Sequence, residues 1–252
     1  MIVSSNAKKP KIHSSSYVAP SATVGGDVTI GSGCSILHGA VIVSEGAPVT
    51  IGSDTVVMEN AVLKASGGSA LRFPLSIGDR CIVGPHAYVV GATIGAGCLV
   101  ASGAKIFNGA TLEDGSGVAL GGIVHVNARL TRGSSVPMQH VAFGDPATIY
   151  PPDKAAEVHA LANFYQTVFN LDPGDDVRAR AAATYAKFLR KTHAQDVALA
   201  EHKHVKAPAR RSGEEPPPTQ ATQVDKVVDV MMLEWEEMEH RRQESIKRQK
   251  ER

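Results

Sequence analysis

Aliphatic residues recur at nearly every sixth position between residues 12 and 136 of this chain. A six-residue period fits neither a helix nor a simple strand, so it indicates a turn that is repeated in every unit. A small residue usually stands four positions after the aliphatic one, as Cys34 follows Ile30. The aliphatic series consists of Ile12, Val18, Val24, Ile30, Ile36, Ile42, Ile51, Val57, Leu63, Ile77, Val83, Val89, Ile94, Val100, Ile106, Leu112, Val118, Val124, Leu130 and Val136.

This period predicts a parallel β-helix of hexapeptide repeats. Each repeat forms one short strand and one bend, and three repeats close a triangular coil whose aliphatic side chains point to its axis. Successive coils stack about 4.8 Å apart, so about seven coils give one continuous core. Insertions at residues 44–49 and 65–76 interrupt the rhythm, and such loops carry either contacts or only extra length. The alternative is a sandwich of short strands with an accidental rhythm.

The remainder of the chain divides by composition. Residues 1–11 precede the β-helix, which we place at 12–150, and residues 151–202 predict two packing helices, one over 153–171 and one from 176 to about 201. On the first helix, Val158, Leu161, Tyr165 and Val168 share one predicted face. Residues 203–222 contain almost no large apolar side chains and predict a disordered linker.

Residues 223–252 predict an amphipathic tail helix. Its apolar stripe includes Met231, Trp235 and Met238, and its acidic part precedes its basic part, which suits the helix dipole. Such a tethered helix either binds a protein partner or docks on its own domain. The only tryptophan of the chain lies in this stripe, which favours an interface.

The charge and the apolar runs limit the possible partners and the compartment. A net charge of +1 gives no electrostatic reason to expect nucleic-acid binding. No apolar run is long enough to predict a membrane span. Residues 1–11 lack the apolar core of a secretory signal, so we expect an intracellular protein. We favour the cytoplasm, and the mitochondrion is the alternative location.

The three cysteines all occupy the small inward slot of the repeat. They are Cys34, Cys81 and Cys98. A shared register favours core packing over a metal cluster or a nucleophile, and buried free thiols suit a reducing compartment.

Several segments resemble the γ-class carbonic anhydrase branch of the trimeric hexapeptide-repeat proteins. They are GGDVTIGSGCSIL, APVTIGSDTVVMENAVLK, SIGDRCIVGPHAYVVGATIGAGCLVASGAKIFNGA and VAFGDPATIYPPDK, and the resemblance covers about residues 10–171. It implies an all-β fold with C-terminal helices, namely a left-handed parallel β-helix with flanking helices and a flexible tail. It also implies a trimer, either homomeric or mixed with related β-helix subunits, in which a metal lies between subunits.

The same resemblance places the three metal-binding histidines of the family at Lys64, Pro85 and Val90. A zinc hydratase needs three neutral imidazoles and an open position for water, whose pKa the metal lowers to about 7. A proline ring and an alkyl group cannot coordinate, and a lysine binds only when it is deprotonated. The resemblance implies that these replacements remove the metal site, and it puts the family's glutamine at Met58.

Other histidines do not rebuild a site within one chain. His38 and His125 stand two coils away from the ligand slots, and two coils separate groups by about 10 Å, too far for one metal. His86 lies one residue beyond its slot, although contact across a trimer interface leaves a shared site open.

Three function classes remain. We favour a non-catalytic scaffold or assembly module without a cofactor, because ligand-free members of this branch resemble subunits of larger assemblies such as dynactin and mitochondrial complex I. The alternatives are a divergent hydratase that uses zinc and an acyltransferase that uses coenzyme A, with His86 as the candidate general base. The expected interface groove contains Met58, Glu59, Lys64, His86 and Asn108.

Overall fold

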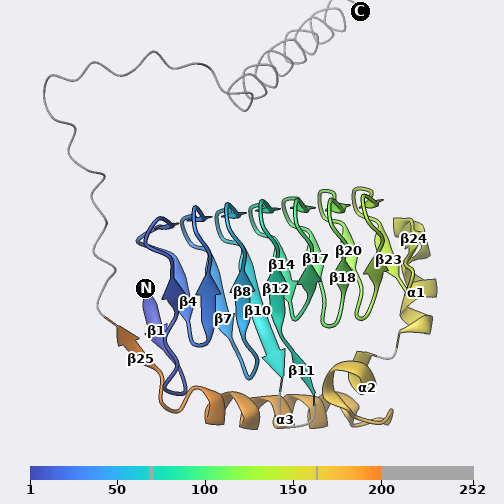
Figure 1. Ribbon diagram of the computed structural model, residues 1–252. Coiled ribbons are helices and arrows are strands. Elements are labelled where there is room, and N and C mark those ends of the chain that lie inside the picture. The colour runs from blue at the N-terminus through green and yellow to red at the C-terminus, as the bar shows by residue number, and fades with distance from the viewer. Residues whose placement is uncertain (68–70, 163, 200–252) are drawn as a thin grey trace, which may run out of the picture. The chain divides into compact units, whose positions relative to one another are not determined.

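The computed structural model describes residues 1–67, 71–162 and 164–199, and these form a three-sided parallel β-helix with helices beside it (Figure 1). The chain visits the three sides in turn, so each side is a sheet whose neighbouring strands come from successive coils. The six-residue period therefore predicted the architecture correctly.

Sheet I is the side that the helices contact. Its parallel strands are β1 (Ile2–Ser4), β4 (Thr23–Gly25), β7 (Val41–Ser44), β10 (Val62–Gly67), β14 (Tyr88–Val90), β17 (Lys105–Ile106), β20 (Ile123–Val124) and β23 (Val141–Phe143). Three antiparallel strands join it, namely β11 (Arg72–Phe73) on β10, β24 (Thr148–Tyr150) on β23 and β25 (Val197–Leu199) on β1.

Sheets II and III have seven strands each within the described part of the chain. Sheet II consists of β2 (Lys11–Ile12), β5 (Val28–Ile30), β8 (Val49–Ile51), β12 (Leu75–Ile77), β15 (Thr93–Ile94), β18 (Thr111–Leu112) and β21 (Arg129–Leu130). Sheet III consists of β3 (Tyr17–Val18), β6 (Ser35–Ile36), β9 (Val56–Val57), β13 (Ile82–Val83), β16 (Leu99–Val100), β19 (Gly117–Val118) and β22 (Ser135–Val136).

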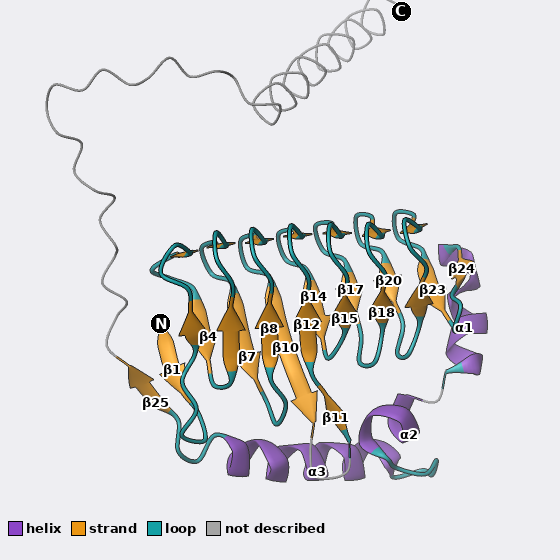
Figure 2. Cartoon of the chain, viewed as in Figure 1, coloured by secondary structure: helices purple, strands orange, loops and turns teal. Residues whose placement is uncertain are grey.

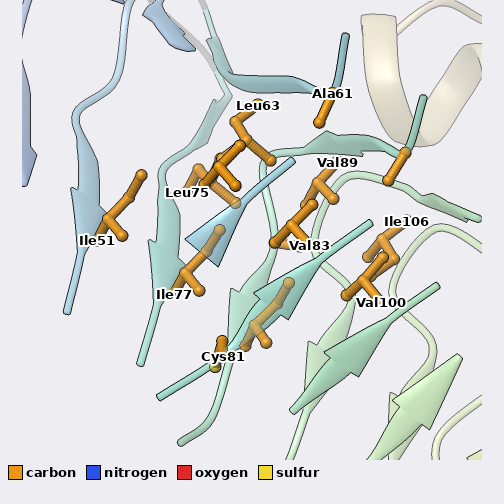
Figure 3. Packing of buried hydrophobic residues seen from close by; sticks show 14 of the residues in the cluster. Ile51, Ala61, Leu63, Leu75, Ile77, Cys81, Val83, Val89, Val100 and Ile106 are labelled. Atoms are coloured by element: carbon orange, nitrogen blue, oxygen red, sulfur yellow. The ribbon is translucent and has the colours of Figure 1, made fainter. Parts of the chain in front are cut away.

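The aliphatic residue of each repeat lies inside the coil. Leu63, Val89 and Ile106 are neighbours in register on sheet I, and each is fully buried. Figure 3 shows these three residues pointing into the same core as Ile77 of sheet II. A fully buried aliphatic side chain contributes about 1.5–3 kcal/mol, so a stack that runs the length of the coil supplies most of the stability.

The small inward slot also behaves as predicted. The three cysteines are 1–2% exposed and are unpaired within the described residues, where they pack among the core side chains.

The helical region differs from the prediction in its first part. In place of one helix over 153–171, the chain forms a short 3₁₀ turn η1 (Pro152–Lys154), helix α1 (Ala155–Leu161) and helix α2 (Phe164–Phe169). The backbone of Ala162 is extended, which ends α1. The predicted apolar face is therefore divided, with Val158 buried and Leu161 60% exposed.

The second predicted helix is shorter than expected. Helix α3 (Val177–Thr192) ends about nine residues before the predicted end near 201, and the chain then forms β25. Strand β1 is the first parallel strand of sheet I and has an open edge whose backbone groups need partners. The chain therefore pairs β25 with this edge and does not continue as a helix. Figure 2 shows α3 running along the coils between α2 and β25.

Within the described ranges, no helix combines the length and the apolar composition that crossing a bilayer requires.

Candidate functional site

A cavity of about 400 Å³ lies between the outward face of sheet I and helices α2 and α3. Strands β10 and β14, the end of β11 and the residues that follow β17 form one wall, and the two helices form the other. The residues that line it are Lys64, Ser66, Gly67, Leu71, Phe73, Tyr88, Val90, Phe107, Asn108, Phe164, Val168, Phe169, Asn170, Thr184, Tyr185 and Phe188.

Lys64 and Val90 are neighbours in register on the sheet wall of this cavity. Each follows an interior residue, Leu63 or Val89, and side chains alternate along a strand, so both point out of the coil. Two of the three positions that the resemblance assigns to metal ligands therefore lie side by side. The third, Pro85, lies at the corner between β13 and β14 and does not line the cavity.

A buried polar cluster surrounds the Lys64 ammonium. Lys64 Nζ lies 2.7 Å from Glu45 Oε2 and donates to Tyr185 Oη at 2.6 Å, while the Tyr185 hydroxyl donates to the same Glu45 oxygen at 3.1 Å. The side chains of Lys64 and Glu45 are only 17% and 10% exposed. Glu45 follows β7 and Tyr185 belongs to α3, so the cluster joins the coil to the helix.

This cluster keeps Lys64 charged. Burial opposes the charged form, but hydrogen bonds to Glu45 and Tyr185 and the negative charge of Glu45 outweigh it, so the pKa of Lys64 is raised above its ordinary value. Burial also raises the pKa of Tyr185, against the opposing hydrogen bond from Lys64. At neutral pH Lys64 is therefore an ammonium and Tyr185 a neutral phenol.

A second contact fixes the segment after α3. His193 Nε2 lies 3.8 Å from Glu45 Oε1, and His193 Nδ1 lies 2.7 Å from Asp196 Oδ2. Residues on both sides of the C-terminal end of α3 thus reach toward Glu45, which lies at the centre of the contacts between coil and helix.

A further polar contact in the cavity pairs Asn108 with Ser66 of β10. Asn108 Nδ2 donates to Ser66 Oγ at 2.5 Å, and Asn108 is 5% exposed. Half of the remaining lining residues are aromatic, including Phe107 from the sheet side and Phe188 from α3.

Comparison with known proteins gives the family. No family model matches the sequence. The mitochondrial gamma carbonic anhydrase 1 of Arabidopsis thaliana is 30% identical over 196 residues, which cover 74% of this chain and 68% of that protein. The chain belongs to the γ-carbonic anhydrase family.

Two further proteins are similar to this chain. The mitochondrial gamma carbonic anhydrase 2 of Arabidopsis thaliana is 35% identical over 142 residues, covering 56% of this chain but only 49% of that protein. A hexapeptide transferase family protein of Anaplasma phagocytophilum is 19% identical, with a TM-score of 0.44, covering 76% of this chain and 96% of that structure. A likeness at that level has no bearing on activity.

The five residues expected in one groove separate into two places. Lys64 and Asn108 line the cavity. Met58 lies on the outward face of sheet III, where its amide donates to Val83, and Glu59 follows it at the corner. His86 is exposed at this same corner, in a left-handed turn with φ of 57°.

The candidate histidines of the coil, unlike His193, lack acidic partners among the residues that the structure describes. Within the described residues, neither His38, which contacts Ser21, nor His86 has a carboxylate bound to its ring. His125 lies between Phe107 and Phe143, and burial lowers its pKa. The part of the chain that the structure describes contains no group of three His, Cys, Asp or Glu side chains that suits a metal ion.

Sequence reasoning missed Glu45 and Tyr185 as site residues. Glu45 stands in the first insertion, where a carboxylate normally indicates a solvated loop, and Tyr185 resembled an ordinary member of the apolar stripe of α3. The sequence did contain one signal. Glu45 stands next to the position four residues after Ile42, which the repeat places inside the coil. Met231, Trp235 and Met238 of the predicted tail helix lie outside the described residues, as does the predicted linker.

Proposed function

We propose that this γ-carbonic anhydrase family member is not a hydratase and acts as a trimeric assembly module. The observation that carries the proposal is the Lys64–Glu45–Tyr185 cluster, which occupies the face that the resemblance assigns to metal ligands. α3 supplies one of the three groups, so the packing of the protein's own helix depends on the residue that replaces the first ligand.

The residues at the three ligand positions do not fit zinc. A catalytic zinc site has three protein ligands with lone pairs and one open position. The Lys64 ammonium has no lone pair, and its raised pKa keeps it protonated at neutral pH. Val90 offers an alkyl group and Pro85 a ring without a free donor atom. No hydration step therefore runs through these residues.

Metal analysis tests this part of the proposal. Protein purified without chelators should contain far less than one zinc or iron per chain and should not accelerate carbon dioxide hydration in a stopped-flow indicator assay. A sample dialysed against zinc is the control, because it separates a missing metal from a missing site. One metal per chain together with hydration activity refutes the proposal.

The outward face of sheet III supports self-association. The residues that point outward from its strands are uncharged, and Tyr17, Ile82 and Leu99 are 44–48% exposed. The outward face of sheet II instead carries threonines and charged groups, such as Thr93 and Arg129. A contiguous exposed apolar face usually marks an interface, and Met58 lies on this one. We assign it to contact between copies in a homotrimer.

Light scattering coupled to size exclusion tests the interface. Leu99→Asp places a carboxylate in the apolar face and should shift the protein from trimer to monomer. Thr93→Asp makes the same kind of change on sheet II and should leave the trimer intact. A wild-type monomer, or a trimer insensitive to Leu99→Asp, rules out this face.

In this proposal the trimer binds a protein partner through the tail of the chain. Residues 223–252 are the proposed docking segment, and a pull-down with this segment fused to a carrier should retain a protein that the carrier alone does not. An intracellular location fits this role. Imaging of the tagged full chain distinguishes the cytoplasm from the mitochondria, the compartment in the names of the two plant relatives.

A further inference from the structure

The cavity beside Lys64 is larger than the polar cluster in its wall requires. Its volume of about 400 Å³ is within the range of small-molecule sites, about 300–1,000 Å³, and is enough for a compound with two fused rings. The Lys64–Glu45–Tyr185 contacts accordingly explain one edge of the cavity but leave the rest without an assigned role.

The lining favours an aromatic ligand. Five phenylalanines and two tyrosines contribute rings from both walls, which are Phe73, Phe107, Phe164, Phe169, Phe188, Tyr88 and Tyr185. Rings that surround a cavity offer both faces and edges, and aromatic pairs prefer offset-stacked or edge-to-face contact. A flat apolar ligand meets both geometries here, whereas a flexible chain gains less from them.

The charges favour a neutral ligand with one polar group. Lys64 is the charged residue among the described lining residues, and Glu45 lies 2.7 Å behind it, so an anion in the cavity gains no net charge attraction. An ammonium has three donors, and Glu45 and Tyr185 use two of them. The third is left for an uncharged acceptor such as a carbonyl oxygen.

We propose that this cavity binds a neutral, flat aromatic small molecule that carries one hydrogen-bond acceptor, with the rings against Phe107 and Phe188 and the acceptor at Lys64 Nζ. This site goes beyond the assembly role. Zinc content and trimer formation test that role independently, so failure of ligand binding refutes the ligand site alone.

The test uses the full chain and a probe of the stated chemistry, 6-propionyl-2-(dimethylamino)naphthalene, which is neutral, bicyclic, carbonyl-bearing and fluorescent. We expect a saturable blue shift with one probe per chain. The anionic probe 1-anilinonaphthalene-8-sulfonate should bind about tenfold more weakly or worse. Absence of saturable binding, or tighter binding of the anion, overturns the proposal.

Two matched helix variants locate the probe. Thr184 and Ala183 are both exposed on α3, but only Thr184 lines the cavity. Thr184→Trp should fill the mouth and weaken binding of the neutral probe about tenfold, whereas Ala183→Trp should leave binding unchanged. Equal effects of the two variants place the probe elsewhere and overturn the proposal.

A third variant tests the sheet wall. Val90→Phe adds a ring at the floor and should also abolish binding. Should this variant fail to fold, which circular dichroism would reveal, the two helix variants still decide the question because both positions face solvent.

Discussion

Two ladders of residues run side by side along sheet I, one position apart in sequence, and they differ in residue type and in what their side chains contact. The inner ladder contains only aliphatic residues, namely Val24, Ile42, Leu63, Val89, Ile106, Val124 and Ala142. The outer ladder contains Gly25, Val43, Lys64, Val90, Phe107, His125 and Phe143.

The comparison shows which part of this fold is free to change. An inner side chain touches the coils on either side of it, so any polar or misshapen residue there disturbs a packed core. An outer side chain meets its neighbours on the outer ladder and whatever covers the sheet, and what covers the sheet differs from coil to coil. Residues on the outer ladder can therefore be exchanged without altering the coil.

The largest loss of stability is expected from a substitution in the inner ladder. Leu63→Ala removes a fully buried side chain and should lower the free energy of unfolding by about 2–5 kcal/mol. Thr50→Ala, at an exposed position of sheet II, is the control and should change it by less than about 0.5 kcal/mol. Denaturant titrations at one fixed protein concentration measure both, since self-association makes stability depend on concentration. Similar losses in the two variants would contradict the distinction between inside and outside.

The inner ladder could be predicted from sequence for the same reason that it is costly to change. Each coil imposes the same requirement at the same spacing, so the period reveals Leu63 and Val89 without knowledge of the fold. The shared register likewise placed Cys81 in the core. The repeat in the sequence is thus sufficient to predict which residues lie inside the coils.

The outer site could be predicted only in part. The resemblance directed attention to Lys64 and Val90, which the structure places side by side, and Asn108 lines the same cavity. The partners of Lys64 were not predictable, because the Tyr185–Glu45 hydrogen bond joins residues 140 positions apart. The end of α3 was wrong for a similar reason, since β25 pairs with β1 at the other end of the described chain.

A smaller effect is expected when the outer cluster is broken. Glu45→Gln leaves the Lys64 ammonium without its countercharge and should cost about 1–3 kcal/mol, because a largely buried charged donor loses its best partner. The double variant Glu45→Gln/Lys64→Met removes both charges and should recover much of this loss.

A double-mutant cycle on the same denaturation assay measures the coupling, with Lys64→Met as the second single variant. Strictly additive losses would mean that Glu45 and Lys64 do not stabilise each other, and the cluster would then not explain how α3 is held.

The smallest effect is a loss of stability at alkaline pH. Lys64 and Tyr185 both have raised pKa values in the folded protein, so each binds its proton more tightly there than in the unfolded chain. Their contribution is complete below the unfolded pKa values, near about 10, and is lost as the pH rises through the folded ones. Stability should therefore begin to fall near about pH 10 and continue to fall above it, by less than the loss from Glu45→Gln.

The triple variant Glu45→Gln/Lys64→Met/Tyr185→Phe isolates this contribution, because it keeps the packing of the cluster but removes its titrating groups. Its stability should decline less steeply than that of the wild type over the same alkaline range. The inner ladder contributes equally to both proteins and cancels in the difference. If the two slopes are equal, the alkaline loss comes from the remaining lysines and tyrosines, and the outer ladder does not hold α3 through a charged Lys64.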